Sequence, residues 1–124
     1  MRRKRGTGLV HNELKVLAAA LLIYCRDGSD RPYGYELFTL LKTWEGEAPM
    51  DYGTLYRCLR SLERFGMFTS ESDPTGDRLR VWYRLTEQGL QAAQRATIQL
   101  AALDEPPVWI DISVATKLPP FPAR

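Results

Sequence analysis

Apolar residues recur at three- and four-residue steps in four stretches of the chain, which is the spacing of amphipathic α-helices. These stretches cover residues 12–26, 32–44, 51–66 and 86–103. Asn, Asp or Thr stands at the start of three of them as a candidate N-cap, and Pro lies near the start of the other. The sequence therefore predicts four helices joined by short connections.

Between the third and fourth helices the pattern changes to two short strands. We expect these strands at residues 67–71 and 79–85, because residues 73–77 (Asp-Pro-Thr-Gly-Asp) form a strong turn signal between them. Helix, turn, helix and hairpin in this order make a winged helix-turn-helix, whose second helix usually enters the DNA major groove. The predicted fold is α+β, mainly helical, with one further helix at each end of the winged helix-turn-helix.

The chain is long enough for one domain, which we divide into four parts. Residues 1–11 are expected to form a basic flexible arm, 12–85 the winged helix-turn-helix, and 86–105 the C-terminal helix. Residues 106–124 form a tail bracketed by Pro pairs, in which apolar side chains alternate over residues 108–114. Two interpretations of the tail stay open: an extended segment lying over the domain surface, or a strand added to the wing or to a partner subunit.

Composition excludes several classes of protein. The 124 residues are 44% hydrophobic and 26% charged, as in ordinary globular proteins. The longest apolar stretch, residues 16–24, is too short to cross a bilayer, and no apolar run follows the basic start, so we expect a cytoplasmic protein without a membrane partner. Cys25 and Cys58 fall in separate helices and His11 is the single histidine. This set predicts reduced core thiols, no metal site and no cofactor.

Positive charge is concentrated locally, although the formal net charge is only +2. In the third helix, Leu55, Leu59 and Leu62 share a narrow arc, and three arginines spread over about 60° on the opposite side. The candidate DNA contacts of this helix are Tyr52, Thr54, Tyr56, Arg57, Arg60 and Arg64. A solvated face is the alternative interpretation of the arginines, and the neighbouring turn and basic hairpin favour the DNA-binding one.

The roles expected for these side chains differ. Arg57 and Arg60 can each present two donors to guanine O6 and N7, which contributes about 1–3 kcal/mol of discrimination per good pair. Tyr52 and Tyr56 are expected to touch phosphate or sugar, and Arg64 phosphate only.

Two further basic segments are candidates for contact with the DNA backbone. In the hairpin these are Arg78 and Arg80, for which pairing with Asp73 and Asp77 is the alternative. The N-terminal arm contributes Arg2, Arg3, Lys4 and Arg5, which either follow the minor groove or phosphates, or form a solubilising terminus.

Four motifs in this order resemble the PadR family of transcriptional regulators. They are Tyr-Gly-Tyr-Glu-Leu at 33–37, Gly-Thr-Leu-Tyr at 53–56, Leu-Arg-Ser-Leu-Glu-Arg-Phe-Gly at 59–66 and Trp-Tyr-Arg-Leu-Thr-Glu-Gln-Gly at 82–89. The resemblance covers roughly residues 9 to 104. It implies a homodimeric repressor that binds an inverted-repeat operator in double-stranded DNA and is released by a small-molecule effector near the dimer interface.

The resemblance also implies that the first and C-terminal helices form the dimer. A 3-4-3 seam in the C-terminal helix agrees with packing against another helix. The expected interface residues are Leu14, Leu17, Leu21, Leu90, Ala93, Thr97 and Leu100.

Two other functions compete with the repressor. The first is a winged-helix protein-interaction module that has kept the fold without reading DNA. The second is an enzyme, which the sequence disfavours: the single histidine falls in the expected arm, and no Gly-rich phosphate loop, nucleophile elbow or metal-ligand spacing is present, so no catalytic residue is assigned.

Overall fold

The computed structural model describes residues 11–27, 34–46, 50–72 and 81–116. Its elements, in chain order, are α1 (His11–Asp27), α2 (Gly34–Glu45), α3 (Tyr52–Arg64), β1 (Phe68–Ser72), β2 (Val81–Leu85), α4 (Glu87–Ala101) and α5 (Ser113–Thr116). The predicted order of helices and strands is confirmed, and the mainly helical winged fold with it. His11, which the sequence placed in the arm, is instead the first residue of α1.

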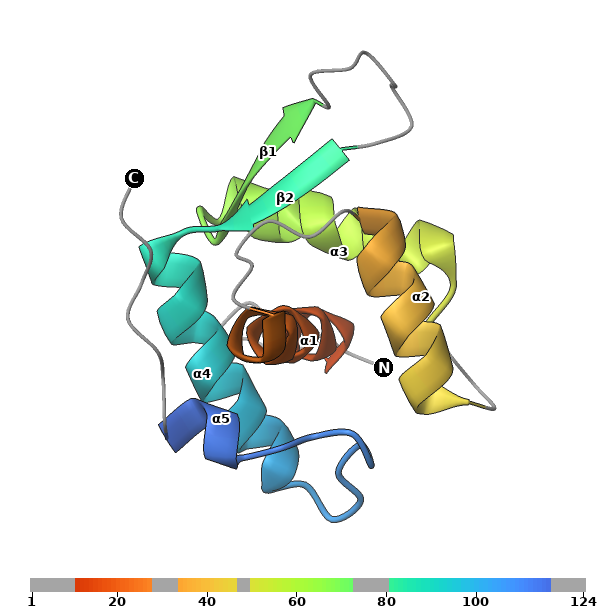
Figure 1. Cartoon of the computed structure of the whole chain (residues 1–124), viewed down its shortest axis with the longest axis vertical. Helices are drawn as coiled ribbons and strands as arrows, with labels where there is room; N and C mark the ends of the chain where they lie inside the picture. Colours follow the sequence, from red (N-terminus) through yellow and green to blue (C-terminus); the bar gives the residue numbers. More distant parts are fainter. Residues whose placement is uncertain (1–10, 28–33, 47–49, 73–80, 117–124) are drawn as a thin grey trace, which may run out of the picture.

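Helix α1 occupies the centre of the molecule. Figure 1 views it end-on, with α2, α3 and α4 placed around it. Every residue from Val16 to Leu21 is buried, as expected for a helix that other elements cover on all sides. Three consecutive alanines at 18–20 lie in this stretch, and their small side chains allow neighbouring helices to approach closely.

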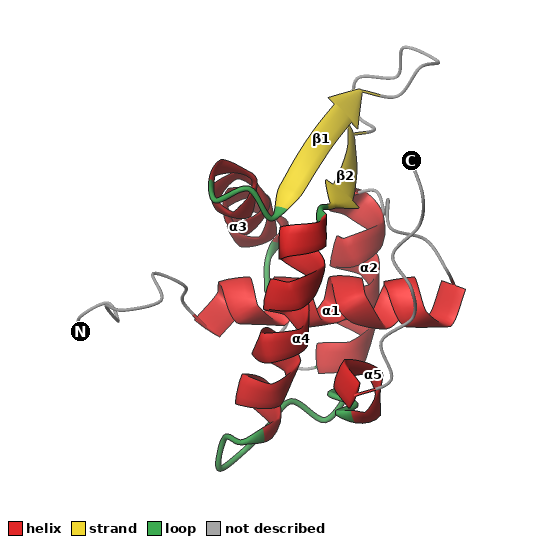
Figure 2. Cartoon of the chain, turned by 90° about the vertical axis from the view of Figure 1, so that its left-hand side faces the viewer, coloured by secondary structure: helices red, strands yellow, loops and turns green. Residues whose placement is uncertain are grey.

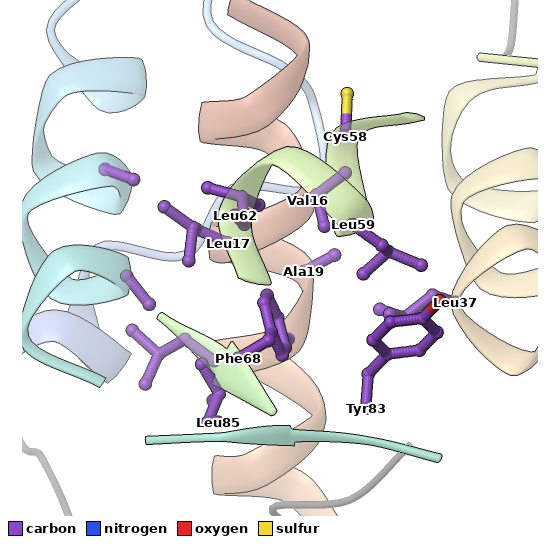
Figure 3. Close-up of a cluster of buried hydrophobic side chains, with 14 of the residues drawn as sticks. Val16, Leu17, Ala19, Leu37, Cys58, Leu59, Leu62, Phe68, Tyr83 and Leu85 are labelled. Atoms are coloured by element: carbon purple, nitrogen blue, oxygen red, sulfur yellow. The ribbon is translucent and has the colours of Figure 1, made fainter. Parts of the chain in front are cut away.

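The wing is a two-stranded antiparallel hairpin in which Phe68 pairs with Leu85 and Ser72 with Val81. Side chains alternate along each strand, so Phe68, Tyr83 and Leu85 reach the core while Thr69 is exposed. Figure 3 shows Phe68 between the wing and the core leucines. Its ring stands perpendicular to that of Tyr83, with 6.3 Å between centroids. Figure 2 shows the hairpin extending away from the helical body on the same side as α3.

Helix α3 is fixed at both ends. At the start, Asp51 accepts a hydrogen bond from the Thr54 backbone N–H at 2.7 Å, as predicted for an N-cap. At the end, Gly66 adopts a φ of +82°, which glycine reaches without steric cost. There the Gly66 N–H donates to Glu63 O and the Met67 N–H to Leu62 O, both at 3.0 Å. This paired arrangement satisfies carbonyls that the helix end leaves open.

The turn after α3 is joined directly to the start of α4, and we call this contact the α3–α4 junction. Thr86 caps α4 by accepting from the Gly89 N–H at 2.9 Å, and its hydroxyl donates to Gly66 O at 2.7 Å. The Thr86 N–H donates to Met67 O at 3.1 Å. A Cβ on Gly89 would lie 1.9 Å from Met67 O. Only glycine lets the two backbones approach so closely, which explains the final glycine of the 82–89 motif.

The C-terminal segment does not form the strand that one of its two interpretations held. Residues 102–112 form turns, α5 follows, and no strand is present in the tail residues that the structure describes, 106–116. The alternating pattern fails because Trp109 turns inward and stacks on Trp44 of α2, with ring centroids 5.3 Å apart. Asp111 then stabilises a turn by accepting from both the N–H and the hydroxyl of Ser113. The segment lies over the domain surface, as the other interpretation held, but it is not extended.

The residues predicted for the dimer interface lie mainly inside a single chain. Six of them are at most 4% exposed: Leu17, Leu21, Leu90, Ala93, Thr97 and Leu100. They are buried where α1 packs against α4, which is the most extensive contact between helices. Leu14 is half-buried. The seam in α4 does pack on another helix, and in this chain that helix is α1, while the dimer interface itself stays a prediction.

Candidate nucleic-acid interface

Helix α3 has one buried and one exposed side. Leu55, Cys58, Leu59 and Leu62 are buried. On the opposite side, within the arc set by 3.6 residues per turn, four exposed residues form what we call the arginine stripe: Gly53, Arg57, Arg60 and Arg64. The prediction that one face of this helix packs while the other is positive is confirmed at the level of burial.

A short chain of contacts holds the N-terminal turn of this helix. Arg57 Nη2 donates to Thr54 Oγ1 at 3.2 Å, while the Thr54 N–H donates to Asp51. Hydrogen bonds from the backbone and the side chain of Thr54, and then the positive charge of Arg57, hold the pKa of Asp51 below its usual value. The carboxylate of Asp51 thus remains ionised and bound to backbone at neutral pH, and it offsets part of the Arg57 charge.

Aromatic rings from three elements line one flank of α3. Tyr52 stacks on Tyr56 with centroids 6.1 Å apart, and Phe38 of α2 meets Tyr52 edge-on at 5.2 Å. Tyr83 of the wing meets Tyr56 edge-on at 6.4 Å. Burial, and then a hydrogen bond with Tyr56, raise the pKa of Tyr83. We call these four residues the aromatic row; it ties the flank of α3 to α2 and to the wing.

Two cations lie on this row. The Arg60 guanidinium is 5.1 Å from the Tyr56 ring centroid, and Lys42 Nζ is 5.9 Å from that of Phe38. Both distances are within the range of cation–π attraction, worth about 0.5–1 kcal/mol at exposed sites. The rings therefore restrict where these two charges can move.

The structure brings together the predicted contacts of α3. Thr54, Arg57 and Arg60 surround its first two turns, and Tyr52 is 40% exposed. Tyr56 is half-buried and its hydroxyl is hydrogen-bonded to Tyr83. Its contribution to this surface is therefore the ring under Arg60. Arg64 is exposed at the other end of the helix. The remaining predicted contacts, Arg78, Arg80, Arg2, Arg3, Lys4 and Arg5, lie outside the described residues.

Three residues of this surface escaped the sequence prediction: Gly53, Phe38 and Lys42. Gly53 could have been noticed in the sequence, because glycine is unfavourable inside a helix and the residues around it favour one. The four-residue spacing of Phe38 and Lys42 places them on one face of α2. Their position beside Tyr52 depends on how α2 and α3 pack, which the spacing does not contain.

The structure gives the cysteines the role that the sequence expected. Cys58 is buried, Cys25 is half-buried, and both are free thiols. Burial raises the pKa of Cys58 to about 11. Over the described ranges no group of three His, Cys, Asp or Glu side chains is placed to hold a metal ion, and no helix is long and apolar enough to span a membrane.

Comparison with known proteins assigns the family. The sequence model of the "Transcriptional regulator PadR-like family" matches residues 28–95. A solved structure of a PadR family transcriptional regulator from Eggerthella lenta DSM 2243 is 31% identical with a TM-score of 0.51, over 71% of this chain and 76% of that one. A "probable transcriptional regulator" from Pseudomonas aeruginosa is 21% identical with a TM-score of 0.49, over 91% and 78%. The search of curated proteins gives no match.

The family assignment rests on the first two of these similarities. The matched span, residues 28–95, includes α2, α3, both strands and the first part of α4. It therefore contains the arginine stripe and the aromatic row. The regulators of this family are not enzymes, which agrees with the sequence prediction. The chain belongs to the PadR-like family of transcriptional regulators.

Proposed function

We propose that this regulator is a sequence-specific DNA-binding repressor that acts in the cytoplasm as a homodimer on an inverted-repeat operator. The observation that carries the proposal is the arginine stripe, whose residues are exposed along the whole of α3. The opposite side of the same helix is buried, so α3 has a single orientation in the domain. A helix of this kind fits the major groove and can present its side chains to base edges.

The surroundings of the stripe support this proposal. Capping at both ends and the aromatic row hold α3 rigidly, so little conformational entropy is lost when it binds. Cations on the stripe provide the salt-dependent attraction to phosphates that all DNA-binding proteins use. The wing leaves the body on the same side as α3 (Figure 2).

For the dimer, we propose the exposed side of α4 in place of its buried seam. Gln91, Arg95, Ile98 and Ala102 are exposed and follow one another at three- and four-residue steps. Ile98 is 46% exposed and is the large apolar side chain of this face. Two-fold pairing here gives the two copies of α3 the symmetry of an inverted repeat, with half-sites about one helical turn apart.

A small-molecule effector completes the proposal. An open apolar pocket of about 330 Å³ lies beside the C-terminal end of α4. Its volume is at the lower end of the range for ligand sites. The lining residues are Ala101, Pro106, Pro107, Val108, Ile110 and Ile112. An apolar effector that binds here would act close to the proposed dimer contact on α4.

Selection and sequencing of bound duplexes from a random DNA pool, at two salt concentrations, tests DNA reading. We expect an enriched inverted repeat. The double variant Arg57→Ala/Arg60→Ala should lose binding at least 100-fold, since the proposed dimer loses four arginine contacts to DNA, each worth about 1 kcal/mol or more. Arg26→Ala, which removes an exposed arginine from α1, is the control and should bind normally.

The protein-interaction module remains the competing function. It predicts that no motif is enriched, that binding simply disappears as salt rises, and that the double variant changes nothing beyond this electrostatic background. Those results would replace the repressor with the interaction module.

Sedimentation of Ile98→Glu tests the proposed dimer contact. A charge at the centre of the α4 surface should dissociate the dimer and weaken binding to the inverted repeat more than binding to a half-site. Thr69→Glu places the same charge on an exposed residue of the wing, outside this surface and outside the pocket, and it should remain dimeric. A dimeric Ile98→Glu would move the interface elsewhere.

A further inference from the structure

Arg57 and Arg60 are both exposed on α3, but the structure holds their guanidinium groups in different ways. Arg57 lies over the first turn of the helix and is bound through one nitrogen to Thr54. Arg60 lies over the ring of Tyr56. This difference decides which of the two can present a free two-donor edge to a base.

The Arg57 side chain runs back toward the N-terminal end of α3, as long side chains on helices do. Gly53 lies one turn before it and has no side chain to compete for this space. A Cβ on Gly53 would be 3.9 Å from Arg57 Nη1 and 3.7 Å from Asp51 Oδ1. The guanidinium therefore lies close to the first turn of the helix, near Gly53 and the capping carboxylate.

This position of Arg57 is not explained by the stability of the helix. The N-terminal end of a helix carries partial positive charge, so a cation placed there is electrostatically unfavourable. Asp51 offsets that cost, since it lies close enough to Arg57 for the two charges to attract. An exposed cation held at this end by Thr54 and Asp51 is suited to binding a group outside the protein.

The donors left on Arg57 define that group. Thr54 uses one N–H of Nη2, which leaves the other N–H of Nη2, both of Nη1 and that of Nε. In the major groove, guanine presents two adjacent acceptors, O6 and N7. Adenine pairs its N7 acceptor with an N6 donor, which would oppose an arginine N–H. Two parallel donors therefore match guanine and no other base.

Arg60 is held by a ring that is itself fixed. Tyr56 stacks on Tyr52 at 6.1 Å and meets Tyr83 of the wing at 6.4 Å. With its guanidinium 5.1 Å from the Tyr56 centroid, Arg60 is drawn toward the flank of α3 that faces the wing. A guanidinium against this flank is placed to meet the sugar–phosphate chain bordering the groove, where a point charge suffices.

We propose, on the basis of the DNA-binding function above, that Arg57 reads one guanine in each half-site and that Arg60 binds the DNA backbone without base preference. Arg57 is thus the specificity-determining arginine of the stripe. Thr54, Asp51 and Gly53 are the residues that position it.

The test repeats the selection with Arg57→Ala and Arg60→Ala, each confirmed to be folded by circular dichroism. Arg57→Ala should lose the preference for guanine at one position of each half-site and, because the dimer loses two such contacts, bind the wild-type operator about 30-fold more weakly or worse. Arg60→Ala should weaken binding to all sequences, keep the motif, and reduce the slope of log affinity against log salt by about 2, one for each subunit of the dimer.

An operator with 7-deazaguanine at that position isolates the contact to one atom. The base keeps its Watson–Crick pairing but lacks N7. Wild-type protein and Arg60→Ala should bind this operator at least 5-fold more weakly than the natural one. Arg57→Ala should bind the two operators equally, because it has no donor to lose.

The outcomes separate this proposal from the function on which it rests. A guanine preference that survives Arg57→Ala, or one that is lost in Arg60→Ala, overturns the division between the two arginines and leaves the repressor intact. A wild-type selection that yields no motif removes the repressor function, and the guanine contact with it.

Discussion

The arginines of α3 and Trp109 of the C-terminal segment 102–116 are each held by contacts within one chain, but these contacts span very different distances along the sequence. The two arginine contacts of α3 join residues three or four apart, Arg57 to Thr54 and Arg60 to Tyr56. In the C-terminal segment, Trp109 stacks on Trp44 of α2, 65 residues earlier in the sequence. Contacts of the first kind follow from helical spacing, and contacts of the second kind depend on the folded domain.

Among the variants that test this comparison, Trp109→Ala is expected to have the largest effect on stability. Truncation removes the stack on Trp44 and should cost about 2 kcal/mol of unfolding free energy, less than a fully buried Trp because the side chain is half-buried. Urea denaturation followed by circular dichroism measures the loss. DNA affinity of the folded fraction should stay within twofold, since Trp109 lies outside α3.

Trp109→Phe is the matched control for that prediction. The ring indole nitrogen of Trp109 is buried without a hydrogen-bond partner, and leaving a buried donor unpaired is itself unfavourable. Phe keeps a ring for stacking and removes this donor, so we expect a change within about 1 kcal/mol. A loss as large as that of Trp109→Ala would mean that ring size, and not stacking, holds the segment.

A smaller and pH-dependent effect is expected at the start of α3. Because hydrogen bonds from Thr54 lower the pKa of Asp51 in the folded chain, its carboxylate stabilises the fold above the unfolded-state value of about 4 and loses this contribution as pH falls through the lower folded value. Asp51→Asn keeps a capping oxygen without the charge. The Tm of wild type should exceed that of Asp51→Asn at pH 7, and the difference should shrink at pH 3.

Asp51→Ala completes this series. It removes the cap as well as the charge, so its Tm should be below that of Asp51→Asn at both pH values. Equal Tm values for the two variants would show that the cap oxygen contributes nothing, contrary to the 2.7 Å hydrogen bond from Thr54.

The smallest effect is expected from Gln94→Ala. The Gln94 side chain on α4 donates to Ala115 O and so ties α5 down. Its loss should cost about 0.5–1.5 kcal/mol and should raise hydrogen exchange at the amides of α5 more than in α3. Gln91→Ala, on the exposed side of the same helix, is the control. Equal exchange in the two variants would contradict the role of this bond.

Helical periodicity also accounts for what the sequence predicted well and where it stopped. It identified the buried and exposed sides of α3 and the seam of α4, because burial repeats with the helical turn. It could not say which helix covers that seam, since α1 of the same chain and α4 of a partner require the same pattern. Leu90 and Leu100 were therefore assigned to a dimer although they are buried in one chain.

The same limit explains the tail and the flank of α3. Alternating apolar residues indicate a strand only when a neighbouring strand is present to pair with, and around Trp109 the structure offers an indole ring on α2 instead. No local feature of the sequence indicated that Phe38 would lie beside Tyr52 or that Lys42 would lie over the Phe38 ring. Gly89 is intermediate: its motif was recognised, but the approach of Met67 that requires glycine is a contact between segments.

The α3–α4 junction has a mechanical consequence. Thr86 is bonded to Gly66 and Met67, Gly89 touches Met67, and Gln88 donates to Phe65 O at 3.3 Å. Since these contacts join the turn after α3 to the first turn of α4, we expect the two helices to move together as one rigid unit. A change in the orientation of α4 would therefore change the orientation of α3 as well.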